Sequence, residues 1–346
     1  MRERISLTAT ARVAALLAGS VSVAASAFAH HAATGLYDRA TPASVTGTIT
    51  SVFWRNPHVR LTLAVAGAGG AAEVWEVETG SVNTLERMGV TADRFNVGDR
   101  LEVSGYAGRN GRKIIFAQEV VAANGDSLPL GGGGGGDITQ RYARPEQLAA
   151  GRALDSGPAT DIFRVWVPMV VPNTGNGRVS YPLTPAALAA RQKYDATQDP
   201  ALRCVPPGMP AAMDNPYPVA FEQRGDDIVF KLEEWDGVRT IHLRAPASVP
   251  APSPMGYSVG HWEGDTLVVE TDRIDYPYFD DLGTPQSGAI HISERFTLQR
   301  DARKLSWEAR IVDPANFTEP VVQKIEWQWI PGHEIKPFDC ALATDK

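Results

Sequence analysis

Apolar and polar residues alternate in short segments along most of this chain, and the segments fall into two groups. Alternation with a period of two places successive side chains on opposite faces, which is typical of β-strands. The first group predicts strands at residues 43–54, 59–65, 72–79, 100–106 and 113–121, with a short helix at 82–88. Three strands, a helix and two strands follow the order of the OB fold, a five-stranded barrel.

The second group predicts eight further strands, at residues 217–223, 227–234, 238–243, 256–262, 266–271, 289–299, 304–312 and 321–329. Turn signals at 224–226, 235–237 and 263–265 indicate hairpins, so neighbours in sequence should pair antiparallel. A closed barrel has no exposed strand edges. We therefore expect an up-and-down barrel of the lipocalin, or calycin, type and an all-β fold class.

The polar and glycine-rich stretches between the two groups indicate the domain boundaries. Six glycines at 131–136 cannot hold a packed element and predict a flexible linker over 127–140. Residues 141–215 are rich in Pro, Gly and Asn and predict an irregular wrapping segment with one helix at 185–194, capped by Thr184. The predicted domains are an OB-like barrel at 30–126 and a calycin-like barrel at 216–346.

The first 29 residues have the pattern of a secretory signal peptide. Arg2 and Arg4 precede a short apolar stretch at 13–25, and Ala27-Phe28-Ala29 offers a small-x-small cleavage site. The stretch is too short to span a membrane. We expect cleavage near Ala29, a mature chain that begins at His30, and a periplasmic or secreted protein.

Charge and cysteine content further limit the expected partners and indicate a disulfide. The formal net charge of −7 disfavours a nucleic-acid partner. No later segment has the apolar length of a membrane span. Cys204 and Cys340 are the only cysteines, and an oxidising compartment favours a disulfide between them. The alternative is two free thiols, one of them a nucleophile, although neither has a neighbouring group that would lower its pKa.

Motifs in both halves resemble known sequence families. His30-His31-Ala32 followed by Trp54-Arg55-Asn56-Pro57-His58 resembles an uncharacterised family of small secreted bacterial proteins. The second half resembles the β-domain of hypothetical proteins from environmental proteobacteria and acidobacteria, through residues 204–210, 255–271, 283–287 and 291–296. The resemblance implies compartment and layout but no activity. Tyr257, His261 and Gln286 depart from it, standing where relatives carry His, Arg and His.

A histidine at the mature N-terminus suggests a copper site. The α-amine and imidazole of His30, with a third nitrogen from His31 or His58, would form the tetragonal nitrogen set that suits Cu(II). This arrangement is the histidine brace of copper monooxygenases. Cleavage after Ala27 would remove the brace, and a solvated N-terminal segment without a role is the other alternative.

The strand predicted at 289–299 carries a carboxylate in an apolar row. Glu294 alternates with isoleucine, phenylalanine and leucine, whereas His291 and Arg295 lie on the opposite face. Burial would raise the pKa of Glu294 and prepare a general acid or base. The alternative is a structural ion pair with an Arg of a neighbouring strand. In a wide, ligand-holding barrel, His291 and Arg295 would instead line the lumen.

The loop before that strand is acidic and aromatic, and barrel-mouth loops often carry sites. Asp280 or Asp281 could orient a reacting group or bind a hard cation such as Ca²⁺. His242 and His261 are strand histidines that could point inward. The motifs of serine hydrolases, zinc proteases and nucleotide-binding enzymes are missing.

These observations lead to one main hypothesis and two alternatives. The main hypothesis is a lyase, isomerase or hydrolase that holds a small apolar or carbohydrate-derived molecule in the second barrel. Glu294 would be its acid or base, His291 or His261 the partner, and Asp280 or Asp281 the orienting group. The alternatives are a non-catalytic carrier and a copper-binding protein, oxidase or monooxygenase that uses His30, His31 and His58.

Overall fold

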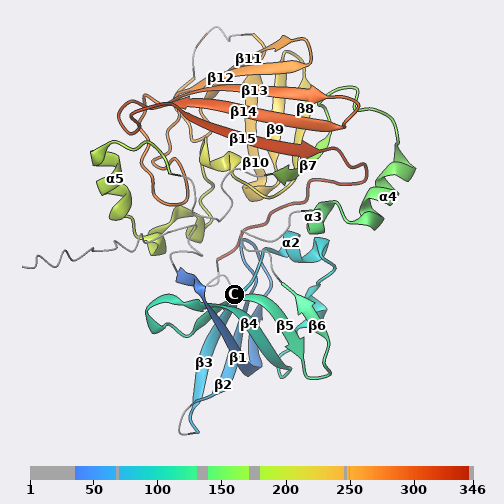
Figure 1. Ribbon diagram of the computed structural model, residues 1–346, viewed down its shortest axis with the longest axis vertical. Helices are drawn as coiled ribbons and strands as arrows, with labels where there is room; N and C mark the ends of the chain where they lie inside the picture. Colours follow the sequence, from blue (N-terminus) through green and yellow to red (C-terminus); the bar gives the residue numbers. More distant parts are fainter. Residues whose placement is uncertain are drawn as a thin grey trace, which may run out of the picture.

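The computed structural model describes residues 36–67, 70–130, 139–170, 180–244, 248 and 250–342. Figure 1 shows two β-domains stacked along the long axis. The predicted signal peptide, His30, His31 and the glycines at 131–136 lie outside the described residues.

The N-terminal domain has the strand order expected of an OB barrel. Its strands are β1 (Tyr37–Phe53), β2 (Arg60–Ala66), β3 (Ala72–Glu78), β4 (Arg100–Gly108), β5 (Ile114–Ala122) and β6 (Ser127–Pro129). β1 pairs with both β2 and β4, and a parallel pairing of β3 with β5 closes the sheet on itself. Helix α2 (Val82–Arg87) lies between β3 and β4 in sequence, as predicted.

Local sequence explains these elements. Leu61 and Leu63 of β2 alternate into the domain core. Ser81 caps α2 by accepting a hydrogen bond from the Thr84 amide. Asn110 and Gly111 have φ angles of 56° and 69°, as the predicted β4–β5 hairpin requires. The 3-10 turns of the domain are Ala92–Arg94 and Arg109–Gly111.

The first domain extends into the segment predicted as linker. β6 pairs with β5, and the amide of Leu130 donates to the carbonyl of Gln118. Leu130 is buried in the core of the domain. Apolar Leu128 and Leu130 therefore continue the packed sheet up to the start of the glycine run.

The C-terminal domain is a closed barrel of nine strands. They are β7 (Val165–Val170), β8 (Val219–Arg224), β9 (Asp227–Leu232), β10 (Gly237–His242), β11 (Tyr257–Glu263), β12 (Thr266–Asp272), β13 (His291–Gln299), β14 (Lys304–Val312) and β15 (Val321–Gln328). They follow one another around the barrel in sequence order, and β15 closes on β7.

The barrel differs from the expected one in strand number and in one pairing. The additional strand, β7, lies in the segment predicted as irregular, where Pro168 interrupts the strand pattern. β10 and β11 pair in parallel because a long connection separates them, whereas every other neighbouring pair is antiparallel. An odd number of strands cannot close with antiparallel pairs alone.

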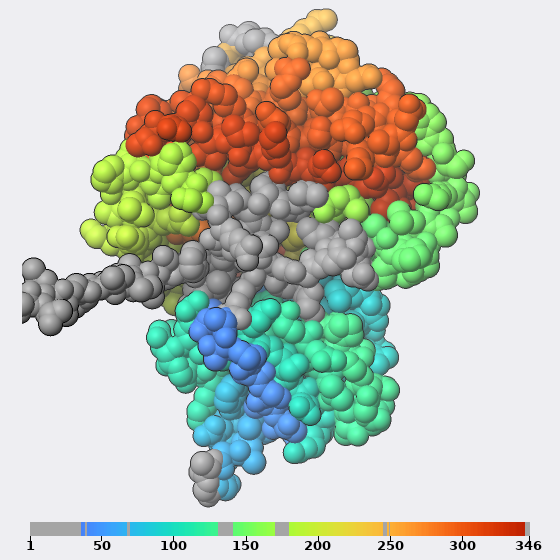
Figure 2. Space-filling view, viewed as in Figure 1, coloured from blue at the N-terminus to red at the C-terminus, as the bar shows by residue number. Residues whose placement is uncertain are grey.

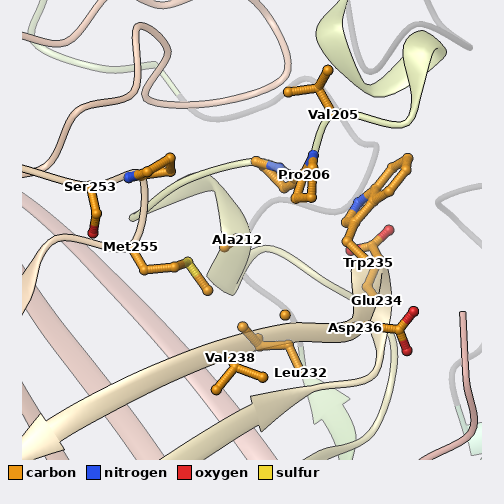
Figure 3. Close-up of a pocket in the computed structure, with 13 residues that line it drawn as sticks. Val205, Pro206, Ala212, Leu232, Glu234, Trp235, Asp236, Val238, Ser253 and Met255 are labelled. Carbon is orange, nitrogen blue, oxygen red and sulfur yellow. The ribbon is translucent and has the colours of Figure 1, made fainter.

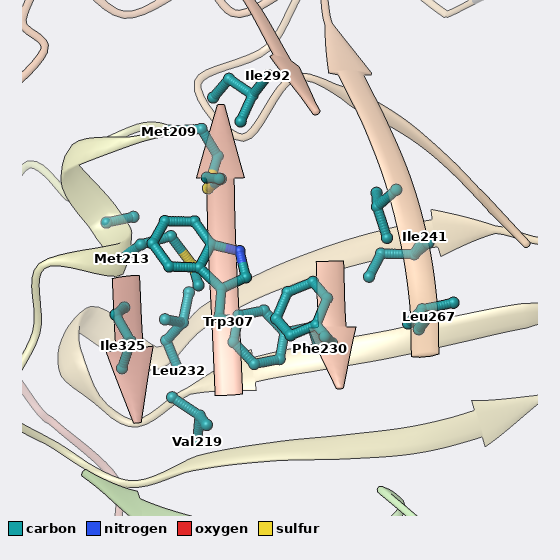
Figure 4. Close-up of a cluster of buried hydrophobic side chains, with 14 of the residues drawn as sticks. Met209, Met213, Val219, Phe230, Leu232, Ile241, Leu267, Ile292, Trp307 and Ile325 are labelled. Carbon is teal, nitrogen blue, oxygen red and sulfur yellow. The ribbon is translucent and has the colours of Figure 1, made fainter. Parts of the chain in front are cut away.

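Side chains fill the barrel interior. Figure 4 shows apolar residues from several strands converging, among them Phe230, Ile241 and Trp307. The alternation predicted for β13 holds, with Glu294 buried and His291 exposed. The interior face is therefore the apolar one, and the polar face predicted for a wide lumen is on the outside.

Helices and turns cover the edges of the barrel. α3 (Thr139–Tyr142) and α4 (Pro145–Leu154) lie at one side and α5 (Pro185–Gln192) at the other (Figures 1 and 2). Thr184 caps α5, as predicted. Short 3-10 turns occupy Ala196–Gln198, Pro200–Arg203, Ala211–Met213 and Glu234–Asp236. In the part of the chain that is described, no helix has the length and hydropathy needed to cross a bilayer.

A buried ion pair joins the two domains. Glu233, between β9 and the turn that follows it, is fully buried. Both its oxygens accept from the guanidinium of Arg87 on α2, at 2.5 Å each. Asn83 of α2 and the amide of Lys336 donate to the same carboxylate at 3.0 and 2.9 Å. The charge of Glu233 is therefore compensated by the other domain and by the C-terminal tail.

The C-terminal tail runs between the domains and is covalently held. Cys204 and Cys340 form the predicted disulfide, with Cα atoms 5.8 Å apart. Cys340 forms a β-bridge with Asn56 of the first domain, and the amide of Ala341 donates to the Asn56 carbonyl at 3.0 Å. The tail thus links the Cys204 loop of the second domain to the Asn56 loop of the first.

Replacing Arg87 by Met should destabilise the protein strongly, because Glu233 would remain buried without its counter-ion. We expect a loss of about 3–5 kcal/mol in the free energy of unfolding, measured by urea denaturation. Arg94→Met is the matched control, since Arg94 forms only a loose, exposed pair with Asp126. Equal destabilisation by both variants would contradict a structural role for the Arg87 pair.

Candidate functional site

Glu294 forms a closed ion pair inside the second barrel. Both its oxygens accept from Arg239 of β10, one of them at 2.9 Å from Nη1. Thr271 Oγ1 and Trp307 Nε1 each donate to the same carboxylate at 2.9 Å. The side chains of Glu294 and Arg239 are 0% and 1% exposed. The carboxylate is thus saturated with donors and shielded from solvent.

This geometry matches the structural ion pair weighed in the sequence analysis, with one difference. The Arg comes from β10, which is three strands away from β13 around the barrel, and it reaches Glu294 across the interior. Arg239 is held in turn by Ser258 Oγ at 2.9 Å and Thr271 Oγ1 at 2.6 Å. A fully paired carboxylate in a packed core has no room for a substrate, so the geometry does not favour an acid–base role for Glu294.

The candidate histidines of the barrel lie on its outer face. His291 Nε2 is 2.8 Å from Glu270, and His261 Nε2 is 3.3 Å from Glu263. Both are exposed. His242, which is partly buried, pairs with Asp227 at 2.8 Å rather than pointing inward. The structure therefore does not bring these histidines together with Glu294.

The two aspartates of the acidic loop have different environments. Asp280 accepts from the amides of Leu282 and Thr284, both at 3.0 Å, and from the Thr284 hydroxyl at 2.9 Å. Burial raises the pKa of Asp280, although Arg191 and these hydrogen bonds oppose the shift. Asp280 therefore shapes the loop, whereas Asp281 lines a pocket between the domains.

His58 lies in that same pocket, held by a defined set of contacts. Its Nδ1 is 2.8 Å from the carbonyl oxygen of Thr79 and 3.1 Å from Glu78 Oε1. Because a carbonyl only accepts, we assign the hydrogen to Nδ1, which leaves the Nε2 lone pair available. Tyr37 donates to the other oxygen of Glu78 at 2.9 Å. The pKa of Tyr37 is raised by burial and by this carboxylate.

The pocket has a volume of about 90 Å³, and we call it the interdomain pocket. It brings together two residues that sequence analysis placed in separate candidate sites, His58 and Asp281. Burial raises the pKa of Tyr217 to about 12, so its phenol stays protonated at neutral pH. The lining residues are Pro57, His58, Glu78, Asp199, Ala201, Leu202, Pro207, Ala211, Asp214, Tyr217, Glu234, Trp235, Tyr276 and Asp281.

A larger hollow, which we call the apolar cleft, adjoins the interdomain pocket at the end of the barrel. Its volume is about 470 Å³. Figure 3 shows Val205 and Pro206 on one side and Leu232 and Val238 on the other. The cleft and the interdomain pocket share Pro207, Glu234 and Trp235. The apolar cleft and the more polar interdomain pocket are therefore neighbours that share part of one wall.

Sequence reasoning missed Glu78, which holds His58, and also Trp235. Residues 235–237 indicate only a hairpin turn in the sequence, and this turn is present in the structure. However, Trp235 and Asp236 both adopt positive φ, at 61° and 51°. This uncommon conformation for a bulky residue places the indole in the wall of both hollows. A tryptophan within a turn signal was the available clue.

The comparison with known families concerns the first domain. Residues 18–116 match a family of unknown function, DUF6152. The matched region contains His30, His31, Tyr37, His58 and Glu78. A search of the curated proteins found no match. Within the described residues, no group of three or more His, Cys, Asp or Glu side chains is arranged to hold a metal ion.

Removing one partner of the Arg239–Glu294 ion pair should lower the free energy of unfolding more than removing both partners. Glu294→Leu leaves Arg239 buried without a counter-ion, and we expect a loss of about 3–5 kcal/mol. Adding Arg239→Met should recover part of that loss, as measured by urea denaturation of the single and double variants. Strictly additive losses would argue against a coupled pair.

Proposed function

We propose that this protein binds a small, largely apolar molecule in the apolar cleft, with the polar end of the molecule in the interdomain pocket. The observation that carries the proposal is a 470 Å³ apolar hollow that shares Pro207, Glu234 and Trp235 with a neighbouring polar pocket. Ligand pockets commonly have such an apolar body with a few converging polar groups. The packed barrel interior supports a site at the end of the barrel rather than inside it.

The lining of the interdomain pocket supports a ligand whose polar end donates hydrogen bonds. Glu78, Asp281 and the Nε2 of His58 are acceptors. The ligand would therefore carry hydroxyl or amino groups. If the protein also transforms the ligand, His58, oriented by Glu78, is the group positioned for proton transfer.

The proposed location is the periplasm or the extracellular medium. The signal-like segment at 1–29 and the Cys204–Cys340 disulfide support this location, because disulfides persist in oxidising compartments.

A charged side chain in the apolar cleft should prevent binding of an apolar probe. Val238 lines the cleft and is 54% exposed, so Val238→Glu should fold normally. We expect it to weaken binding of the neutral dye Nile red at least about tenfold, because an apolar molecule in the cleft would strip water from the carboxylate. Dye fluorescence titration measures the affinity.

Val322→Glu is the matched control, because Val322 is 53% exposed on β15 and does not line the cleft. It should leave the affinity for Nile red unchanged. If both variants bind the dye as the wild type does, or if the wild type shows no saturable binding, the proposed function is wrong.

Copper binding is a second candidate, favoured by the geometry of His58. Metal-binding histidines usually donate their second ring N–H to a carbonyl or carboxylate, as His58 Nδ1 does. His58 and Tyr37 both contact Glu78. Tyr37 follows His30 by seven positions in the sequence, and an extended chain covers roughly 3.3–3.6 Å per residue. The chain length therefore permits a site shared by His58, His30 and His31.

Exported protein with a mass that begins at His30 should then bind one equivalent of Cu(II) with nitrogen hyperfine coupling in its electron paramagnetic resonance spectrum. His58→Ala should reduce that coupling and the affinity, whereas His261→Ala, at an exposed position on the outer face of the barrel, should not. A spectrum unaffected by His58→Ala would exclude His58 as a ligand.

A further inference from the structure

A third hollow shares no lining residue with the apolar cleft. It has a volume of about 400 Å³, and we call it the arginine cavity. α4, the turn between β13 and β14, and the segment after β15 surround it. Leu148, Met169 and Ile330 give it an apolar wall, and Arg152 and Arg303 supply positive charge.

Arg303 is held firmly at this cavity but is incompletely hydrogen-bonded. The guanidinium carbons of Arg303 and Arg164 each lie 4.1 Å from the ring centroid of Trp329. Two cations at this distance cannot share one face, so the indole lies between them. Arg164 pairs with Asp161 at 3.0 Å. Among the described residues, the Arg303 guanidinium donates a hydrogen bond only to the carbonyl of Asp155, 2.8 Å from Nη1.

Two nitrogen atoms of Arg303 lack an acceptor within the described structure. Nε and Nη2 are both buried and make no hydrogen bond. Buried donors without partners are rare because each loses its bonds to water without replacement. The guanidinium therefore retains unused capacity for an anion, and its planar fork fits a carboxylate well.

The backbone of Arg303 also adopts a conformation that is unfavourable for a residue other than glycine. Its φ is 55°, in the left-handed region that favours glycine. The carbonyl of Arg303 is fixed by the amide of Trp329 at 2.8 Å and by Gln328 Nε2 at 2.9 Å. An arginine thus occupies a turn position that suits glycine, and its backbone is locked in place.

We propose that the arginine cavity binds a small carboxylate with an apolar body. The carboxylate accepts from the guanidinium of Arg303, and the hydrocarbon part packs against Leu148 and Met169. Arg152 adds positive charge at the exposed rim, and Asp301 is the one carboxylate in the lining. Two guanidinium groups against one carboxylate leave the cavity positive. This site is independent of the proposed function of the apolar cleft.

Calorimetric titration of the full-length protein with benzoate tests the proposal, with benzyl alcohol as the neutral probe of the same shape. We expect saturable binding of benzoate and much weaker binding of benzyl alcohol. Arg303→Gln should weaken benzoate binding about tenfold or more, the order expected for losing a charge-assisted hydrogen bond. Arg224→Gln, an equal loss of charge at an exposed position on β8, should have no effect.

A second variant tests the cavity without removing Arg303. Leu148→Glu places a carboxylate in the apolar wall and should abolish benzoate binding, whereas Leu154→Glu, 69% exposed at the end of the same helix, should not. Equal affinity for benzoate and benzyl alcohol, no saturable benzoate binding by the wild type, or unchanged binding by Arg303→Gln would each overturn the proposal.

Discussion

The buried carboxylate of Glu233 is the constraint on which the two-domain arrangement depends. It is fully enclosed, and four of its hydrogen bonds come from α2 of the first domain and from the C-terminal tail. Separating the domains would leave an ionised group without partners or require it to be rehydrated, and both are unfavourable. The contact therefore fixes the relative position of the domains, which no single-domain core could do.

The turn Glu234–Asp236, which directly follows Glu233, connects the Glu233–Arg87 ion pair to the candidate site. Glu233 binds Arg87, Glu234 and Trp235 line the hollows, and Asp236 accepts from the amide of Phe338 at 2.9 Å. The ring of Phe338 lies 5.1 Å from that of Trp235. Four consecutive residues thus tie the domain interface, the tail and the proposed ligand site together. A shift of α2 would be transmitted directly to the wall of the interdomain pocket.

Sequence alternation predicted most of the strands because burial on one face leaves a period of two in the chain. It failed for β7, where Pro168 breaks the pattern and pairing to β15 and β8 at both edges supplies the order instead. It identified Glu294 as buried among apolar residues but not its partner, because Arg239 lies three strands away and only barrel closure brings them together. The convergence of His58 with Asp281 depends on domain packing, which leaves no local signal in either segment.

Solvent access explains why the sequence pattern favours Glu294 as the reactive group, whereas the structure favours His58. Glu294 has the apolar surroundings that would raise the pKa of an isolated carboxylate, yet Arg239, Thr271 and Trp307 satisfy its oxygens and its side chain is 0% exposed. His58 has a less apolar environment, but its side chain is 32% exposed and one ring nitrogen is held by Thr79 and Glu78. A group that acts on a ligand needs both a fixed orientation and an open side. Of these two residues, only His58 has both, and the interdomain pocket is therefore the place where binding and any reaction would coincide.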